Sequence, residues 1–242
     1  MVDLHCHILP KIDDGSRSMA ESVAMARMAR ASGVDRIAAT PHFPGKAESV
    51  ELLPKILSRL ERLQLELARE EIDVKIIPGA EILCLPETPE LAKRGMLPTI
   101  GQSRYLLTEF YFDTPGQTLD AMLRGLARQE YIPVIAHPER YGAVQRHPEL
   151  ARRWFEQGYV IQINKGSVLG AFGPEPERCA GQLLEQGIVH VIASDAHRSD
   201  ARTTDMGPLR AWAEENLGRQ YADVVLRRNP GRIIAGKNVV PV

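Results

Sequence analysis

Histidine and acidic residues stand at the ends of several short β-branched runs in this chain. The first run leads into "HCH" and "IDDG", which places His5, His7 and Asp14 close together in sequence. Imidazole and carboxylate donors without thiolate favour borderline-hard divalent ions such as manganese, iron or zinc. The candidate ligands are His5, His7, Asp14, His42, Glu81, Glu109, His137, Asp195 and His197. Because one zinc ion takes about four ligands, these nine candidates predict more than one ion.

The chemistry that such a cluster could perform is hydrolysis of a phosphate ester. Clustered carboxylates repel one another without cations, so the cluster is expected to bind metal. We expect manganese, with iron or zinc as the alternatives. Two ions about 3.5 to 4 Å apart can hold a hydroxide and clamp the attacking and leaving oxygens. Arg140 in "HPER" and Arg202 follow two candidate ligands, and their guanidinium forks could bind phosphate oxygens. Asp14 or His197 could assist as a general acid.

Seven strand-like runs must position these residues, and helical patterns separate them. The "SMAE" stretch predicts a capping box between Ser18 and Glu21, and Gly33 is expected to end that helix. Strands that alternate with helices predict a parallel sheet with helices outside it. We expect strands at 2–7, 36–40, 74–81, 105–109, 132–136, 160–164 and 189–193, and helices at 18–32, 53–67, 118–130, 147–157, 175–186 and 208–217.

The polar residues favour a barrel over an open sheet. They stand at or just after the ends of the predicted strands, and these ends converge on one face only when the sheet closes. His5 and His7 are expected to point together into the mouth of the barrel, with Cys6 facing the wall. We therefore predict an α/β fold, a closed or nearly closed TIM-barrel-like arrangement of seven βα units. No linker-like stretch divides residues 1–242, which we expect to form a single domain.

Composition excludes several classes of protein. The net charge of −1 argues against a nucleic-acid or anionic-membrane partner, and no apolar run is long enough to cross a membrane. The three cysteines, Cys6, Cys84 and Cys179, form no paired motif, which fits a reducing cytoplasm. None of them is followed by the arginine of a C-x5-R phosphatase loop. We expect a soluble cytoplasmic protein, and the sequence leaves its oligomeric state open.

Short motifs along the chain resemble those of a known superfamily. "DLHCH", "TPH", "GAEI", "TEF", "AHPER" and "SDAH" are similar to signatures of the PHP (polymerase and histidinol phosphatase) metallophosphoesterases, whose fold is a distorted seven-unit barrel. The opening "DLHCHILPKIDDGS", together with Glu109, more closely resembles the bacterial PHP-type protein-tyrosine phosphatases. Those enzymes are manganese-dependent partners of tyrosine autokinases in capsular and exopolysaccharide synthesis. The similarity spans nearly the whole chain.

This resemblance implies a three-ion site and a protein substrate. The implied substrate is phosphotyrosine on the tail of a tyrosine autokinase, attacked by metal-activated hydroxide, with Arg140 and Arg202 on the phosphate. One departure is Phe43, which stands where those proteins usually have a second histidine. The implied ligand sets are His5, His7, Glu81 and Asp195 for the first ion, Glu81, Glu109 and His137 for the second with Glu81 as the bridge, and Asp14, His42 and His197 for the third.

Other functions remain as alternatives. The main one is a histidinol-phosphate-type or other small-molecule phosphatase of the same superfamily, although this chain has little room for a lid. A DNA nuclease is disfavoured by the near-zero net charge. A metal-dependent amidohydrolase would be expected to carry lysine where this chain has Glu109, and a metal-holding scaffold would leave both arginines unexplained. Among other polar residues, we expect His190 to be a core histidine and Lys165 to form a surface ion pair more readily than a phosphate contact.

Overall fold

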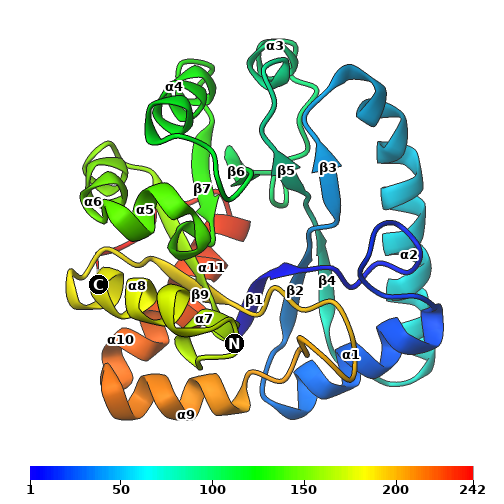
Figure 1. Cartoon of the computed structure of the whole chain (residues 1–242). Coiled ribbons are helices and arrows are strands. Elements are labelled where there is room, and N and C mark those ends of the chain that lie inside the picture. The colour runs from blue at the N-terminus through cyan, green and yellow to red at the C-terminus, as the bar shows by residue number, and fades with distance from the viewer. Residues whose placement is uncertain (242) are drawn as a thin grey trace.

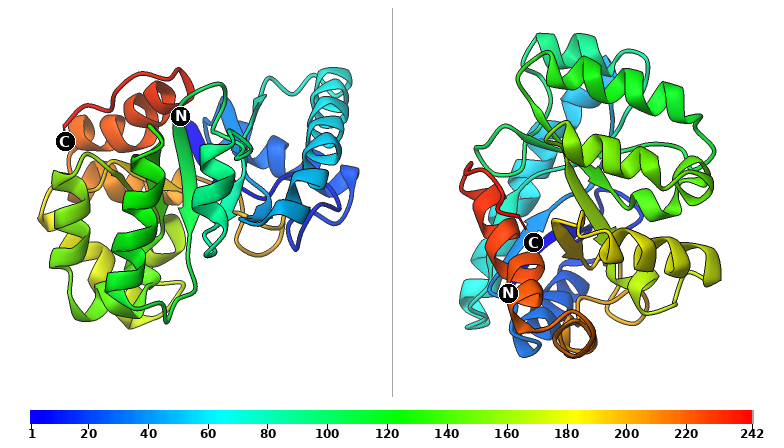
Figure 2. Two further views of the ribbon diagram at one scale, coloured as in Figure 1. Left: turned by 90° about the horizontal axis from the view of Figure 1, so that it is seen from above. Right: turned by 90° about the vertical axis from the view of Figure 1, so that its left-hand side faces the viewer.

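The strands of this protein run parallel in every pairing formed by the described residues. The structure, a computed structural model, describes residues 1–241. Helices lie outside the strands, as the alternating sequence pattern predicts (Figures 1 and 2). The strands are β1 (Val2–Cys6), β2 (Arg36–Ala39), β3 (His42–Pro44), β4 (Lys75–Pro78), β5 (Glu81–Leu83), β6 (Tyr105–Glu109), β7 (Ile132–Ala136), β8 (Val160–Asn164) and β9 (Val191–Ala193).

The predicted strand at 74–81 is interrupted between β4 and β5, and the predicted strand at 36–40 is followed by β3, a short strand that the sequence did not predict. The strands therefore form two sheets. One sheet has the order β1-β2-β4 and the other β3-β5-β6-β7-β8-β9. The break between β2 and β3 falls at Pro41, which has no N–H for a ladder, and that between β4 and β5 falls at Gly79. The prediction that Glu81 ends a strand was wrong in this detail, because Glu81 begins β5, just as His42 begins β3.

The two sheets are joined along β1 and the segment that follows β9. Cys6 and Ala196 form a parallel bridge, and the His7 amide donates to the Ala196 carbonyl at 2.8 Å. The Asp195 amide donates to the His5 carbonyl at 2.9 Å. Buried Asp3 adds a long-range contact, since its carboxylate accepts from both the amide and the hydroxyl of Ser194. The seven strand positions thus follow one another around a common interior.

That interior is a small apolar cluster made by alternate residues of the strands. Leu4 of β1, Leu107 of β6 and Val134 of β7 all pack in it, while the neighbouring Leu106 and Ile135 face the helices. Cys6 also packs on the helix side, as predicted. The period-two alternation of strands explains this division in β6 and β7. In β1 the pairing register shifts between Asp3 and Cys6, so Leu4 and Cys6 lie on different sides although they are two residues apart. The distorted α/β barrel predicted from the sequence is therefore confirmed as the fold class.

Six predicted helices are found within a few residues of their expected bounds. Ser18 Oγ caps α1 by accepting from the Glu21 amide at 3.1 Å, whereas the Glu21 carboxylate accepts from the Arg17 amide. Within residues 1–241, no helix is both long and apolar enough to cross a membrane. The predicted helices are α1 (Met19–Ala31), α2 (Leu53–Arg69), α4 (Gly116–Ala127), α6 (Glu149–Glu156), α8 (Pro174–Glu185) and α9 (Gly207–Asn216).

Shorter helical turns, which the sequence patterns did not predict, fill the loops and the C-terminal segment. One of them, at Pro138–Arg140, directly follows the candidate ligand His137 and carries Arg140. They are η1 (Ala47–Leu52), α3 (Thr88–Lys93), η2 (Pro138–Arg140), α5 (Gly142–Arg146), α7 (Lys165–Val168), α10 (Arg219–Asp223), η3 (Val224–Arg228) and α11 (Asn229–Ile234).

Candidate metal centre

His5 and His7 lie side by side inside the mouth of the barrel. Both side chains are fully buried, and their Nε2 atoms are 3.2 Å apart. Burial lowers the pKa of His7, but hydrogen bonds that the carboxylates of Asp13, Asp195 and Glu81 accept from the ring outweigh it and raise that pKa well above its usual value. Two ring nitrogens that face one another beside carboxylates present their lone pairs to a common point, as metal ligands do.

Glu81 occupies the centre of the cluster. Its Oε1 atom is 3.2 Å from His5 Nε2 and 2.9 Å from His137 Nε2. Its Oε2 atom is 3.2 Å from His7 Nε2 and 3.0 Å from His42 Nδ1. Burial raises the pKa of the Glu81 carboxyl, but the neighbouring imidazoles lower it well below its usual range. Each oxygen of one ionised carboxylate therefore faces a different pair of imidazoles.

Asp195 connects the histidines to the arginines. Its Oδ1 atom is 3.4 Å from His5 Nε2, and its Oδ2 atom is 2.5 Å from Arg202 Nη2 and 3.6 Å from Arg140 Nη1. The Asn164 amide donates to the same Oδ2 at 2.6 Å. Although burial raises the pKa of Asp195, the histidine contacts lower it far below its ordinary value. This carboxylate is therefore ionised and shared between two sides of the site.

The remaining candidates form the more exposed side of the cluster. Asp14 Oδ1 is 3.5 Å from both His42 Nε2 and His197 Nε2, and its side chain is 66% exposed. Glu109 Oε2 is 3.5 Å from His42 Nδ1, and Oε1 is 3.7 Å from His137 Nε2. Burial lowers the pKa of His197 to about 4, so this imidazole is neutral at pH 7. All nine predicted ligands thus converge on one region.

The donor set fits divalent ions. Ligand atoms within 4.8 Å of one another occur in three overlapping groups of described residues. His137 Nδ1 is buried and has no hydrogen-bond partner among these residues, so its Nε2 is the nitrogen that takes part in the cluster. The groups are His7, Asp14, His42 and His197; His5, His7 and Glu81; and His42, Glu81 and Glu109. They overlap the three sets implied by the resemblance but differ in each: His7 is added to the exposed group, Asp195 is missing from the first, and His42 stands in place of His137 in the second.

Three positioning residues were missed by the sequence reasoning. Asp13 Oδ2 lies 2.8 Å from His7 Nδ1 and also accepts from the His42 amide at 2.9 Å. Gln162 Oε1 lies 3.0 Å from His5 Nδ1, and Asn164 bonds Asp195 as described. Such outer contacts fix ring orientation and strengthen metal ligands. Asp13 had a visible signal, since it adjoins Asp14 in the "DD" pair, whereas the two amides had none.

The cluster opens to solvent through a small pocket that both arginines line. Phe43 does not reach it, because this side chain is fully buried in the outer core. The surface ion pair expected for Lys165 is not found among the described residues, because its ammonium donates to the backbone carbonyls of Thr203 and Asp205. The pocket has a volume of about 170 Å³ and is lined by Asp14, His42, Glu81, Glu109, Phe112, His137, Arg140, Asp195, His197 and Arg202.

His190 is a core histidine, as predicted. Its side chain is buried and stacks on Phe155 with ring centroids 5.1 Å apart, and Nδ1 accepts from the Ile161 amide. Burial lowers its pKa to about 4, so the ring is neutral at pH 7. It lies just before β9 rather than within a strand.

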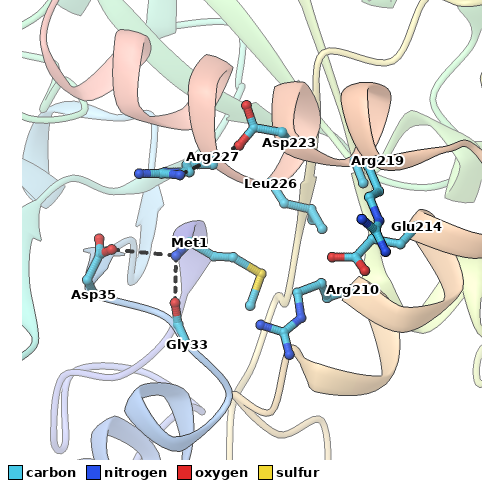
Figure 3. A pocket seen from close by; sticks show the side chains of 10 residues that line it. Met1, Gly33, Asp35, Arg210, Glu214, Arg219, Asp223, Leu226 and Arg227 are labelled. Atoms are coloured by element: carbon cyan, nitrogen blue, oxygen red, sulfur yellow. Dashed lines mark hydrogen bonds and ion pairs between the residues drawn. The ribbon is translucent and has the colours of Figure 1, made fainter.

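A second pocket lies at the opposite, amino-terminal end of β1 and β2 (Figure 3). It is larger, at about 270 Å³, and is lined by the charged side chains of Arg210, Glu214 and Arg219 among others. The Met1 ammonium there donates to the Gly33 carbonyl at 2.6 Å and lies 3.5 Å from Asp35 Oδ2. None of the predicted site residues lies in this pocket.

A parallel α/β fold that gathers imidazoles and carboxylates beside two guanidinium groups defines a metal-dependent phosphoesterase. The chain belongs to the capsular polysaccharide synthesis CpsB/CapC family, whose model matches residues 1–235. The tyrosine-protein phosphatase YwqE of Bacillus subtilis is 37% identical over 84% of this chain and 79% of that protein. The tyrosine-protein phosphatase CpsB of Streptococcus pneumoniae is 32% identical over 97% of this chain and 98% of that protein.

A solved structure gives the same result for the fold. A crystal structure from work on YwqE and CpsB, described there as unique metal-dependent tyrosine phosphatases, superposes with a TM-score of 0.91. The two chains are 30% identical, and the match covers 100% of this chain and 97% of the other. The resemblance to the bacterial tyrosine phosphatases noted from the sequence motifs is thereby confirmed.

Proposed function

We propose that this chain is a metal-dependent protein-tyrosine phosphatase that removes phosphate from a partner protein, a tyrosine autokinase of polysaccharide synthesis. Family membership and the names of its relatives support the activity. We infer three divalent ions, manganese foremost, within a single domain formed by residues 1–242. The three cysteines are buried and free, which supports a cytoplasmic location.

One observation carries this function more than any other. The two oxygens of Glu81 each face two imidazoles, and this arrangement stands at the base of a pocket whose wall carries two guanidinium groups. A bridging carboxylate beside phosphate-binding arginines suits phosphoester hydrolysis better than it suits a storage site for metal.

The residues of the site have two roles in metal binding: some are ligands and others orient the ligands. We infer that the nine candidate ligands, from His5 to His197, hold the ions, while Asp13 and Gln162 fix the orientations of His7 and His5. When bound, the ions supply the chemistry that activates water at neutral pH and offset the charge of the phosphoryl oxygens.

The two arginines bind and orient the phosphoryl group. Arg140 and Arg202 lie within 3.6 Å and 2.5 Å of Asp195 Oδ2, so that carboxylate holds both guanidinium groups beside the ligands. Each guanidinium has further N–H groups with which to bind phosphate oxygens. The leaving phenol has an ordinary pKa of about 10 and needs little protonation. His197 is neutral at pH 7 and carries no acidic proton for this step, so Asp14 is the residue proposed to assist as an acid.

The test compares two substrates in one manganese buffer. We expect kcat/KM for a phosphotyrosine peptide to exceed that for histidinol phosphate at least about tenfold, and a chelator to abolish both activities. The peptide should reproduce a tyrosine-containing tail of the autokinase. A preference for histidinol phosphate would instead favour the small-molecule phosphatase, and full activity after chelation would exclude the metal-dependent reaction.

A further inference from the structure

Two phenylalanines beside the arginines have no part in the functions described so far. Phe112 lies in the loop after β6, lines the pocket, and is 43% exposed. Phe172 lies in the loop after α7, and its ring also contacts the Arg140 guanidinium. An exposed aromatic side chain at the mouth of a small polar pocket has a chemical consequence, because it offers apolar contact only to ligands that carry an apolar group.

The Arg140 guanidinium contacts both of these rings. Its Cζ atom is 4.4 Å from the ring centroid of Phe112 and 4.7 Å from that of Phe172. Phe172 also lies 5.6 Å from the Cζ atom of Arg202. Cation–π contacts at these distances are favourable and restrict the guanidinium to one plane. A phosphate bound by Arg140 is therefore held next to the ring of Phe112.

The Phe112 ring packs against two other rings of the site. It makes an edge-on contact with His137 at 5.9 Å and a tilted contact with Tyr141 at 6.2 Å. The Phe112 carbonyl accepts from the Gly142 amide at 2.8 Å, which ties the loop to the start of α5. His137, Arg140 and Tyr141 thus cover part of the ring, and the exposed part faces solvent at the pocket.

We propose that Phe112 is a specificity-determining residue that contacts the aromatic ring of the substrate, an inference that rests on the proposed function. The ring of a phosphotyrosine is bonded directly to the ester oxygen, so it stands at the pocket mouth when its phosphate lies on Arg140. Aromatic rings pair favourably at centroid distances of about 4.5 to 7 Å. A phosphoserine of the same phosphate position brings no ring to this contact.

Binding of two phosphonates tests this contact without any chemistry. Benzylphosphonate places a ring where the tyrosine ring stands, and methylphosphonate keeps only the anionic group. We expect the manganese-loaded wild-type protein to bind benzylphosphonate more tightly, and Phe112→Ala to reduce this preference about tenfold. Phe112→Leu keeps apolar volume, so its preference for benzylphosphonate should lie between those of the wild type and Phe112→Ala. Calorimetric titration gives both affinities, and thermal melting checks that each variant folds.

Phe172→Ala is the matched comparison. Phe172 touches the same guanidinium, so this change should weaken both phosphonates by a similar factor and leave their ratio near the wild-type value. If Phe112→Ala also weakens both ligands equally, Phe112 acts through Arg140 and the specificity role is wrong. A wild-type protein that binds the two phosphonates equally would overturn it as well.

The proposed function can fail separately. A wild-type protein that prefers benzylphosphonate but does not hydrolyse a phosphotyrosine peptide would contradict the phosphatase activity and leave the ring contact standing. If the wild-type protein hydrolyses the peptide but Phe112→Ala leaves the ratio of the two phosphonate affinities unchanged, only the role of Phe112 is contradicted.

Discussion

The pockets at the two ends of the strands differ in the burial of their charged side chains more than in their size. The amino-end pocket is larger, about 270 Å³ against 170 Å³, but Arg210, Glu214 and Arg219 in it are exposed and remain hydrated. The carboxyl-end pocket stands over His5, His7 and other titratable groups that are almost fully buried. Burying unpaired charge is costly, so such a cluster persists only when the groups share protons or bind cations. Buried convergent donors therefore indicate a site better than volume does.

Removal of Glu81 should give the largest effect. Glu81→Ala is expected to lower aryl phosphate hydrolysis at least about 10³-fold, because one carboxylate serves more than one ion and each ~1.4 kcal/mol of lost stabilisation is tenfold in rate. Assay in excess manganese checks it. Glu214→Ala, in the amino-end pocket, is the matched control and should stay within about twofold of wild type. Near-normal activity of Glu81→Ala would remove the bridging role.

Loss of one guanidinium should be the next largest effect. Arg140→Ala is expected to lower kcat/KM for a phosphotyrosine peptide about 10²-fold, since it removes a donor to the phosphoryl oxygens. Metal content, measured by elemental analysis, should not change. Arg219→Ala at the other pocket is the control, because it removes a guanidinium group that lies outside the site. Loss of metal in Arg140→Ala would mean that this residue supports the ligands instead.

The buried imidazoles make metal affinity depend on pH. Burial lowers the pKa of His42, but Glu109 and Glu81 outweigh it and raise that pKa to about 10. In the metal-free protein this ion pair stabilises the fold fully below about pH 6.5, and the stabilisation is lost as pH rises through about 10. Metal binding depends on pH in the opposite direction: it becomes tighter as pH rises, because the ion must displace the proton.

As pH falls below about 10, manganese affinity should therefore weaken about tenfold per pH unit for each proton displaced, and activity should fall with it. Calorimetric titrations at pH 8, 7 and 6 measure the affinity. A dissociation constant that stays the same across this range would contradict the displacement of protons. His197, whose pKa is lowered to about 4, should contribute nothing to the change.

A smaller effect is expected at Lys165. Its ammonium donates to two backbone carbonyls in the loop that carries Arg202, whose φ of 49° lies in the left-handed region. Lys165→Met should lower kcat/KM about tenfold by releasing Arg202. The double variant with Arg202→Ala should be no slower than Arg202→Ala alone. Additive losses would show that Lys165 acts by another route.

Sequence reasoning predicted which side chains lie together at this end of the barrel, for a physical reason. In parallel α/β folds the carboxyl ends of strands meet at one face, so residues as distant as His5 and Asp195 could be grouped from strand positions alone. The breaks at Pro41 and Gly79 moved His42 and Glu81 from strand ends to strand starts without moving them from that face.

Features set by side-chain packing could not be predicted in the same way. Gln162 and Asn164 look like ordinary polar residues of a strand, and only the structure reveals that their amides hold His5 and Asp195. The direction of Lys165 depends on the path of the loop around Arg202, and the clamp on Arg140 depends on where two unrelated loops place Phe112 and Phe172. Neither has a local sequence signal.

The bridge between Cys6 and Ala196 affects the order of events during synthesis. These residues are 190 positions apart, so β1 and its two histidines leave the ribosome long before the segment against which they pack. Contacts of such long range form late in folding. The nascent chain thus carries an incomplete set of metal ligands until almost its whole length has emerged. It cannot bind metal in the geometry of the folded protein before then.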